Sequence, residues 1–383
     1  MASGMERNQT LSDEERRDWL RLIRTENVGP ITFHALLHRF GSATAALAAL
    51  PDLSRRGGRR GALRIPSRAA AERELIAVER LGASLIASVE PDYPEALAAT
   101  EDAPPLLSVM GHRHLLRRPM VAIVGARNAS ANGLRFARSL AGELGRHDLV
   151  VVSGLARGID GAAHEGALAS GTVAVMAGGL DKVYPREHEA LFERVCAEGA
   201  AVSEMAPGVQ PQARHFPPRN RLVAGMSLGV VVVEAARRSG SLITARLALE
   251  QGREVMAVPG MPTDPRAEGP NHLIRQGATL VTRAEDVIEA LAGALQPRLD
   301  EPPAVAAPAG QPAAVTEIEV DSAHQRLQSL LGPAPVVVDE LIRECQLSAP
   351  AVLTALLELE LAGRLERHAG GRVSLVAEPQ TGA

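Results

Sequence analysis

The feature that most constrains this chain is an alternation, between residues 119 and 295, of short apolar β-branched runs with stretches of helical periodicity. Strands that are apolar on both faces and separated by helices indicate a parallel sheet covered on both sides. The pattern therefore predicts an α/β domain with a Rossmann-like, doubly wound parallel sheet. The candidate strands are MVAIVG (120–125), LVVVSG (149–154), TVAVMAG (172–178), AAVSE (200–204), LGVVVVEA (228–235) and EVMAVPG (254–260).

The residues before this alternation divide into two parts. Residues 63–118 hold a helix, the candidate strand ASLIAS and the segment YPEALAATEDAPPLLSVMG, and we expect them to extend the same domain to 63–295. Residues 1–62 contain short helices joined at a Val28-Gly29-Pro30 break. They predict either a SAM-like or helix-hairpin-helix module, whose turn can present N–H groups to a phosphate, or a plain helical packing domain. The stretch SRRGGRRGA (54–62) is interpreted as a Gly/Arg loop, either a contact with nucleic acid or a solvated linker.

The C-terminal part begins with a tether. Residues 296–322 are rich in proline and alanine without periodicity, which is typical of an extended linker. Residues 323–377 then show three helices and a two-stranded wing, the pattern of a winged helix. The expected recognition helix, 349–362, has no lysine or arginine and carries Glu358 and Glu360, whereas groove binding requires cations and polar base readers. A protein-binding or autoregulatory role is therefore the better hypothesis.

Length and composition limit the class of protein. A chain of 383 residues favours about two or three domains. No apolar run approaches the roughly 18 residues that span a bilayer, and the N-terminus carries charge where a signal peptide is apolar, so we expect a cytoplasmic protein without a membrane span. The formal net charge of −4 requires any nucleic-acid contact to be a local patch. The two cysteines, Cys196 and Cys345, lie too far apart in sequence to suggest a disulfide framework or a metal site.

The first two strand-to-helix turns contain glycine, serine and arginine. In an open parallel sheet, ligands bind beyond the carboxyl ends of the strands, where helix N-termini present free N–H groups. The turn from Gly125 to Ser130 lacks both the dinucleotide fingerprint and the P-loop motif, but Arg127 offers a bidentate cation. In the turn SGLARGID (153–160), Gly154 and Gly158 permit close backbone approach, and Ser153 can bond either the turn or a phosphate. Later in this segment, Asp160 is either a helix cap or a site residue, and His164 is expected to be structural.

The later turns add charge and one aromatic ring. The only lysine, Lys182, stands near Tyr184, so a base can stack on the ring while Lys182 or Arg186 binds a phosphate. Alternatively, Tyr184-Pro185 simply packs at the entrance of the helix. Two further segments, 216–221 and 239–244, open helices. Residues 214–276 contain nine arginines and five acids, so this half of the sheet edge is locally positive.

An enzymatic function finds little support in these motifs. A serine nucleophile would need a paired histidine and the G-x-S-x-G elbow, and neither is present. No histidines and acids are clustered at the spacing of metal ligands. Four acids near the turns are unpaired in sequence but can converge in space, so cleavage of a glycosidic bond on a nucleotide remains the alternative. These acids are Asp160, Asp181, Glu204 and Glu234.

Together the motifs resemble the DNA-processing protein A (DprA/Smf) family. The similarity is dense over about residues 90–285 and weaker in the two terminal regions. The matching segments are YPEALAATEDAPPLLSVMG, AIVGARNASANG, VVSGLARGIDGAAHEGAL, GGLDKVYPREHEAL, SEMAPG, FPPRNRLVAGMSLGVVVVEAARRSGSLITARLALEQGREVMAVPG and GPNHLIRQGA. The resemblance implies a SAM-like, Rossmann-like and winged-helix architecture. It also implies a protein that binds single-stranded DNA in natural transformation, shields incoming strands, loads the RecA recombinase and dimerises through its central domain.

The residues and the resemblance lead to one prediction: a non-catalytic, sequence-independent binder of single-stranded DNA without a cofactor or a bound metal. Because aromatic residues make up only 2% of the chain, stacking is expected to be secondary to phosphate contacts. The alternative is a phosphoribohydrolase of the lysine-decarboxylase-like group, although its Pro-Gly-Gly-x-Gly-Thr motif is missing. The first turn reads Gly-Ala-Arg where the family resembled has Gly-Ser/Thr-Arg, which removes one hydroxyl donor. The predicted phosphate-binding residues are Gly125, Arg127, Ser153, Gly154, Ala156, Gly158, Lys182, Arg186, Arg219, Asn220, Arg221, Gly240, Ser241 and Thr244.

Overall fold

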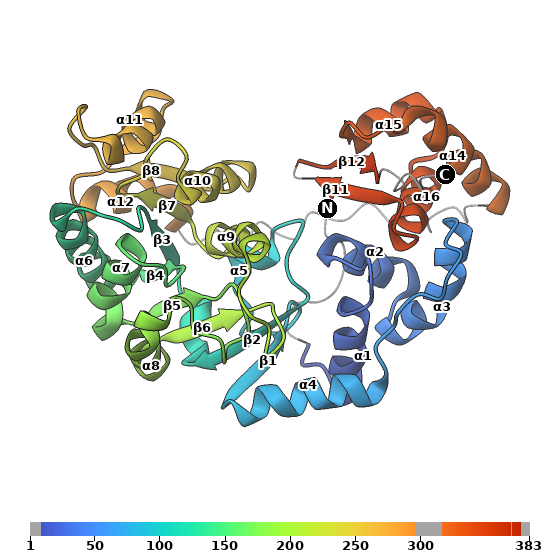
Figure 1. The fold of residues 1–383 in the computed structure, drawn as a ribbon, viewed down its shortest axis with the longest axis horizontal. Helices are drawn as coiled ribbons and strands as arrows, with labels where there is room; N and C mark the ends of the chain where they lie inside the picture. Colours follow the sequence, from blue (N-terminus) through green and yellow to red (C-terminus); the bar gives the residue numbers. More distant parts are fainter. Residues whose placement is uncertain (1–8, 296–315, 369, 377–383) are drawn as a thin grey trace, which may run out of the picture. The chain divides into compact units, whose positions relative to one another are not determined.

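The computed structural model describes residues 9–295, 316–368 and 370–376, which form two compact units. The central unit contains residues 9–12 and 72–295, and the terminal unit contains residues 13–71 together with the described residues from 316 onward. The N-terminal helices and the C-terminal domain, drawn in blue and orange-red in Figure 1, therefore share one unit although most of the chain separates them. The sequence had suggested a separate domain at each end.

The central unit is built on a nine-stranded sheet whose order is β1-β2-β6-β5-β4-β3-β7-β8-β9. In this order, all neighbouring strands between β6 and β9, including β5, β4, β3, β7 and β8, are parallel. The pairs β1–β2 and β2–β6 are antiparallel. All six predicted strands are confirmed, and ASLIAS and LLSVMG extend the sheet as β1 and β2. The strands are β1 (Ala83–Ala87), β2 (Leu106–Gly111), β3 (Met120–Val124), β4 (Val150–Ser153), β5 (Thr172–Val175), β6 (Ala200–Ser203), β7 (Gly229–Val232), β8 (Glu254–Ala257) and β9 (Thr279–Leu280).

Helices cover both faces of this sheet, which confirms the doubly wound fold (Figure 1). On one face α6 (Ala131–Arg146), α7 (Ile159–Ala167) and α12 (Ala284–Ala290) share a core with Val121 and Ile123. On the other face α9 (Phe216–Gly225) and α10 (Gly240–Glu250) share a core with Ala122 and Val124. Alternate residues of β3 thus point to opposite faces, as a strand buried on both sides requires. The other helices of this part of the chain are α4 (Arg68–Arg80), α5 (Glu95–Ala98), α8 (Glu189–Glu198), α11 (Glu268–Arg275) and α13 (Ala292–Leu295).

The terminal unit combines the N-terminal helices with the winged helix. Pro30 at the first turn of α2 and the left-handed Gly41 after it mark the two ends of that helix, as the Gly-Pro break suggested. The three C-terminal helices and the wing are confirmed, with a short additional strand in the order β10-β12-β11. The elements are α1 (Asp13–Ile23), α2 (Pro30–Phe40), α3 (Ala43–Arg56), α14 (Glu317–Leu330), β10 (Val336–Val337), α15 (Val338–Cys345), α16 (Ala349–Leu361), β11 (Leu365–His368) and β12 (Arg372–Leu375).

Three expected boundaries differ from the structure. The residues 54–56, expected in a Gly/Arg loop, complete α3. The tether was expected to reach 322, but α14 already begins at Glu317, because Thr316 and Glu319 form a capping box there. Residues 296–315 lie outside the described residues. The division between the units falls after Ala71 rather than after residue 62. Within the described ranges, no helix has the length and apolarity needed to cross a membrane.

Candidate nucleic-acid interface

A cleft of about 1120 Å³ opens at the carboxyl ends of β3 and β7. The strand order changes direction here, with β4, β5 and β6 on one side of β3 and β7, β8 and β9 on the other. Open α/β sheets bind their ligands at such a switch point. Most of the predicted site residues meet in this cleft: Gly125, Arg127, Gly154, Ala156, Arg219, Asn220, Gly240, Ser241 and Thr244.

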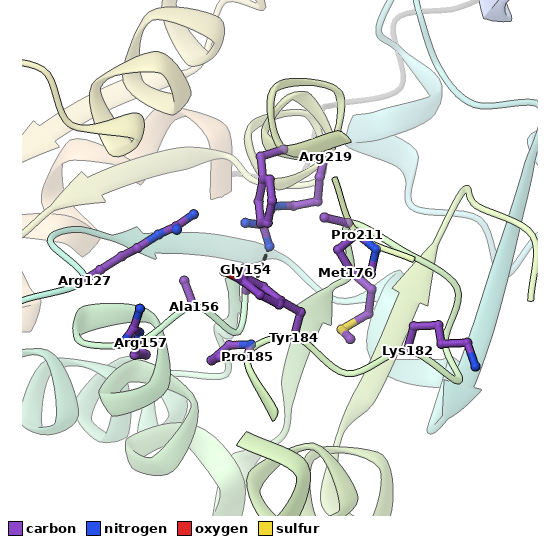
Figure 2. Close-up of a pocket in the computed structure, with 12 residues that line it drawn as sticks. Arg127, Gly154, Ala156, Arg157, Met176, Lys182, Tyr184, Pro185, Pro211 and Arg219 are labelled. Atoms are coloured by element: carbon purple, nitrogen blue, oxygen red, sulfur yellow. Dashed lines mark hydrogen bonds between the residues drawn. The ribbon is translucent and has the colours of Figure 1, made fainter. Parts of the chain in front are cut away.

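An aromatic ring flanked by two cations forms one wall of the cleft. The guanidinium carbon of Arg127 lies 5.2 Å from the ring centroid of Phe216, and that of Arg219 lies 5.7 Å from the same centroid. The ring of Tyr184 meets Phe216 edge to face at a centroid distance of 5.7 Å. Figure 2 shows Arg127, Tyr184 and Arg219 approaching one space from three different segments. The ring face of Phe216 is therefore held by cation–π contacts, while 45% of Tyr184 remains exposed.

Arg219 anchors the floor of the cleft rather than presenting all its donors to a ligand. The residue is only 6% exposed, and its guanidinium donates to the carbonyls of Gly154 and Val175 and to the side chain of Asn220. Burial lowers the pKa of Arg219, and the nearby Asp160 opposes that shift. Arg219 thus ties the ends of β4 and β5 to α9 and contributes positive charge from below. This corrects the expectation of a freely available phosphate ligand.

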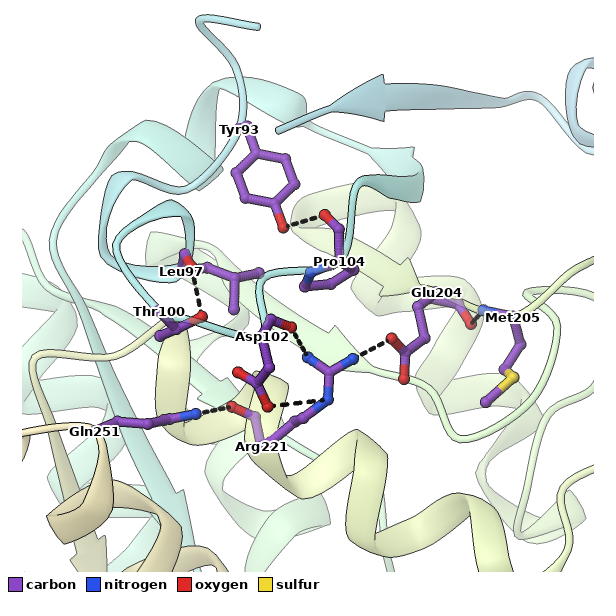
Figure 3. Close-up of polar contacts among 10 residues, drawn as sticks. Tyr93, Leu97, Thr100, Asp102, Pro104, Glu204, Met205, Arg221 and Gln251 are labelled. Carbon is purple, nitrogen blue, oxygen red and sulfur yellow. Dashed lines mark hydrogen bonds and ion pairs between the residues drawn. The ribbon is translucent and has the colours of Figure 1, made fainter. Parts of the chain in front are cut away.

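Arg221 does not belong to the cleft. Residues two positions apart in a helix project to nearly opposite sides. Arg221 therefore leaves α9 on the side away from Arg219. Its guanidinium donates to the backbone carbonyl of Asp102 at 2.8 Å and pairs with the carboxylates of Asp102 and Glu204, as Figure 3 shows. The side chain is 12% exposed. The expectation that Arg221 supplies charge to a phosphate track is therefore corrected to a structural role.

The remaining predicted residues lie away from the cleft. Ser153 is fully buried, and its hydroxyl donates to the carbonyl of Ile123 at 2.7 Å. Gly158 has a φ of 77°, and a Cβ atom there would lie 2.2 Å from the carbonyl oxygen of Ala126, so the position requires glycine for backbone packing. Lys182 lines a narrower adjoining pocket, but its ammonium pairs with Asp181 at 3.1 Å and points away from Arg127 in Figure 2.

Arg186, another predicted phosphate ligand, begins a short 3₁₀ turn (Arg186–His188) and is exposed. It lines neither the cleft nor the narrower pocket. The third strand-to-helix turn therefore contributes only Tyr184 to the cleft.

Two of the turns have backbone N–H groups that are already occupied by carboxylates of the chain. Asp160 accepts from the N–H groups of Gly154 at 3.1 Å and Ala156 at 3.4 Å. Burial raises the pKa of Asp160, an effect that Arg219 and these N–H groups oppose. Glu234 accepts from the N–H and hydroxyl of Ser130, the cap of α6, at 2.9 and 2.6 Å. The helix start at which dinucleotide-binding folds hold a pyrophosphate is thus occupied by an internal carboxylate.

The start of α10 offers the cleft its open anion-binding groups. Ser239 caps the helix and contacts Ser241, while Gly240 is exposed with no atom within 4 Å of an added Cβ. Arg238 precedes this cap, lines the cleft and is exposed. Neither Arg238 nor Arg127 forms an ion pair with any part of the chain that the structure describes. These two cations and the N-terminus of α10 are the groups best suited to an external anion.

Phe216 and Arg238 are among the cleft residues that sequence reasoning missed. Phe216 was noted only as part of a helix start, although it is one of five phenylalanines in the chain and directly precedes Pro217 and Pro218. Arg238 stands immediately before the Ser-Gly-Ser cap and was not among the predicted phosphate-binding residues. Both residues could have been identified by one signal. Each is a rare aromatic residue or an arginine at the start of a helix that begins at the carboxyl edge of the sheet.

Each of the four acids that supported the enzymatic alternative is already held by a hydrogen-bond donor or cation of the chain. Asp160 is bound by backbone N–H groups, Glu234 by Ser130, and Glu204 by Arg221. Asp181 accepts from the N–H of Gly208 at 2.8 Å and pairs with Lys182. His164, expected to be structural, is fully buried against Thr172. Across the described ranges, no group of three histidine, cysteine or acidic side chains is arranged to hold a metal ion.

Comparison with known proteins assigns the family. The model described as DNA recombination-mediator protein A matches residues 84–292, a DprA-like N-terminal HHH domain matches 13–77 and a DprA winged helix domain matches 310–371. Protein Smf of Escherichia coli is 42% identical over 307 residues, which cover 79% of this chain and 80% of the relative. DNA processing protein DprA of Streptococcus pneumoniae is 46% identical over 198 residues, which cover 51% of this chain and 70% of that protein.

Two solved structures agree with these matches. The X-ray structure of DNA processing protein A from Streptococcus pneumoniae has a TM-score of 0.59 at 35% identity and covers 71% of this chain and 95% of its own. DNA processing protein A from Helicobacter pylori, solved to study its single-stranded DNA binding mode, has a TM-score of 0.50 at 30% identity and covers 55% and 96%. The resemblance and the three-part architecture predicted from the motifs are confirmed, and the chain belongs to the DNA recombination-mediator protein A (DprA) family.

Proposed function

We propose that this chain is a non-catalytic recombination mediator that binds single-stranded DNA in the cleft between β3 and β7. The observation that carries the proposal is the pair of exposed arginines, Arg127 and Arg238, which have no carboxylate partner among the described residues at a cleft whose other anion-binding turns are closed. The structural relative from Helicobacter pylori, whose single-stranded DNA binding mode was studied, supports the assignment of the ligand class.

The geometry favours contacts with phosphates over reading of bases. One phosphate fits the N-terminus of α10, where Gly240 leaves room and Arg238 stands beside the cap. A second lies within reach of Arg127, whose guanidinium can form two parallel hydrogen bonds with phosphate oxygens. An unstacked base can then lie against Tyr184 or Phe216, a contact that every base can make. Because paired bases in a duplex are already stacked, this arrangement favours single strands.

The biological role that we propose follows the family resemblance. In this role the chain acts in the cytoplasm during natural transformation, protects incoming strands from degradation and loads the RecA recombinase. It does so as a homodimer formed through the central unit. Three experiments test these properties separately. Nuclease protection of a labelled strand tests the shielding of DNA, and RecA filament formation on DNA already coated by a single-strand-binding protein tests RecA loading. Sedimentation equilibrium tests dimerisation.

A salt titration of binding to labelled oligo-dT tests the cleft. The affinity of the full chain should fall steeply with salt, by about 0.7 in log-log slope for each phosphate contact, and duplex binding should be much weaker. Arg127→Ala and Arg238→Ala should each weaken binding about tenfold or more and reduce the slope by roughly one contact. The matched control is Arg146→Ala, an exposed arginine at the end of α6 and hence at the opposite edge of the sheet.

Two further variants limit the site. Arg186→Ala and Lys182→Ala should change the affinity by less than about twofold, because Arg186 lies outside the cleft and Lys182 is paired with Asp181. Unchanged binding in both Arg127→Ala and Arg238→Ala would show that the cleft is not the DNA site. Turnover of a nucleoside monophosphate by a chain that binds no oligonucleotide would instead support the enzymatic alternative.

A further inference from the structure

The helix α16 of the winged domain is buried on two sides. In winged-helix and related DNA-binding proteins the corresponding helix lies in the major groove, with one side left free for the bases. Here one side, which includes Val352, Leu356 and Leu359, belongs to the core of the winged domain. A second stripe, formed by Leu357, Glu358 and Leu361, is equally buried but does not belong to that core. Within the terminal unit, α16 packs against α3 of the N-terminal helices.

The two helices approach each other closely at Gly57, the cap residue that follows α3. A Cβ atom on Gly57 would lie 1.9 Å from the carbonyl oxygen of Glu358 and 2.9 Å from the Cβ atom of Ala362. The backbone of Gly57 is ordinary right-handed helix with a φ of −67°, so its conformation does not require glycine. The approach of α16 does. A second contact joins α16 to the segment between α1 and α2, because the side-chain amide of Asn27 donates to the carbonyl of Leu361 at 3.3 Å.

A buried carboxylate with nearby cations lies at this contact. The carboxylate of Glu358 is fully buried, and the Nε of Arg56, the last residue of α3, lies 3.2 Å from it. His324 of α14 approaches the other oxygen at 3.4 Å, and Arg39 of α2 adds a favourable charge interaction. A buried carboxylate is costly unless it is compensated, so Glu358 disfavours any arrangement of α16 that lacks these cations. The acid that argues against DNA binding therefore has a partner within the chain.

We propose that α16 is the docking surface for the chain's own N-terminal helices, residues 13–71, and does not read duplex DNA. Two features decide the fit: the missing side chain at Gly57, and the pairing of Glu358 with Arg56. The winged helix and the N-terminal helices then form one composite domain assembled from the two ends of the sequence. This inference does not depend on the proposed function of the cleft, because none of its residues lies in the central unit.

Hydrogen exchange on the full chain, measured by mass spectrometry of peptides covering α3 and α16, tests the docking. Gly57→Leu adds a side chain where the carbonyl of Glu358 stands, so both peptides should exchange about tenfold faster or more. Gly61→Leu is the matched control, because nothing lies within 4 Å of a Cβ atom at Gly61. Unchanged exchange of α16 in Gly57→Leu would overturn the proposal. So would conversion of a dimer into monomers by Gly57→Leu, since the docking partner of α16 would then be a second copy.

A second set of variants guards against simple unfolding. Arg56→Gln leaves the carboxylate of Glu358 with one cation fewer and should deprotect α16, whereas the double variant with Glu358→Gln removes the buried charge and should restore part of the protection. Equal deprotection in the single and double variants would contradict the role of the pair. Adding excess duplex DNA to the wild-type chain should leave the exchange of the α16 peptide unchanged. Protection of that peptide by the duplex would show that α16 reads DNA after all.

Discussion

The cleft of the central unit and the contact between α3 and α16 in the terminal unit use arginine in opposite ways. In the cleft, Arg127 and Arg238 are exposed and have no carboxylate partner among the described residues. In the terminal unit, Arg56 faces the fully buried carboxylate of Glu358. The difference shows that the number of arginines near a helix end says little about anion binding. The position of the nearest carboxylate decides whether the cation is available to a ligand.

The same distinction operates inside the central unit. Arg127 lines the cleft without a carboxylate partner among the described residues, whereas Arg221 is enclosed by Asp102 and Glu204. Both acids lie far from Arg221 in sequence, one before β2 and one after β6. Long-range pairing of this kind separates structural arginines from those that can bind DNA.

The largest expected effect comes from removing a structural arginine. Arg221→Ala leaves Asp102 and Glu204 without their shared cation in a mostly buried site, and we expect a loss of about 3 kcal/mol in the free energy of unfolding. Urea unfolding followed by circular dichroism measures this loss. Arg194→Ala, which breaks an exposed i,i+4 pair with Glu198, should cost less than about 0.5 kcal/mol. A stable Arg221→Ala chain with greatly reduced DNA affinity would contradict the distinction between the two classes of arginine.

The fold could be predicted better than the side-chain pairings, because strands depend on neighbouring residues whereas ion pairs join residues far apart in the sequence. The strands and the doubly wound order follow from local runs such as MVAIVG and LGVVVVEA, which are apolar and β-branched enough to be recognised as strands without knowledge of their partners. The turns that carry Arg127 and Gly240 could be predicted because parallel strands bring their carboxyl ends together. The pairing of Glu358 with Arg56 could not, because it joins residues from opposite ends of the chain, and neither helix shows by itself which element covers it.

Buried titratable groups allow a second test of how the two regions differ. Burial lowers the pKa of His164 in the central unit from 6.5 to about 3. The unfolded chain therefore takes up a proton between these values and the folded chain does not, so stability should fall by about 1.4 kcal/mol per pH unit as the pH drops below 6.5. Burial raises the pKa of Glu358, which has the opposite sign: its stabilising contribution is present below pH 4.5 and is lost as the pH rises through the folded pKa.

Exchange rates of the β4 and β5 peptides at pH 7 and pH 5, corrected for the intrinsic effect of pH, measure the contribution of His164. His164→Phe keeps a ring in the site and cannot take up a proton, so the loss of stability on acidification should be smaller by up to about 2 kcal/mol between these pH values. His147→Phe, at an exposed position after α6, should keep the wild-type dependence. Identical pH dependence in His164→Phe and the wild type would show that another group controls the acid lability of the central unit.

The smallest expected effect converts an occupied anion site into an open one. Glu234→Ala removes the carboxylate that accepts from the N–H and hydroxyl of Ser130 at the start of α6, and we expect a loss of about 1.5 kcal/mol in the free energy of unfolding. Because the freed groups resemble those at the start of α10, millimolar inorganic phosphate should restore part of this stability. Glu143→Ala, in the last turn of the same helix, should show neither effect. Suppose that phosphate stabilises Glu234→Ala no more than it stabilises the wild type. Glu234 then only caps the helix, and it does not explain why the open anion-binding groups of the cleft are confined to Arg127, Arg238 and α10.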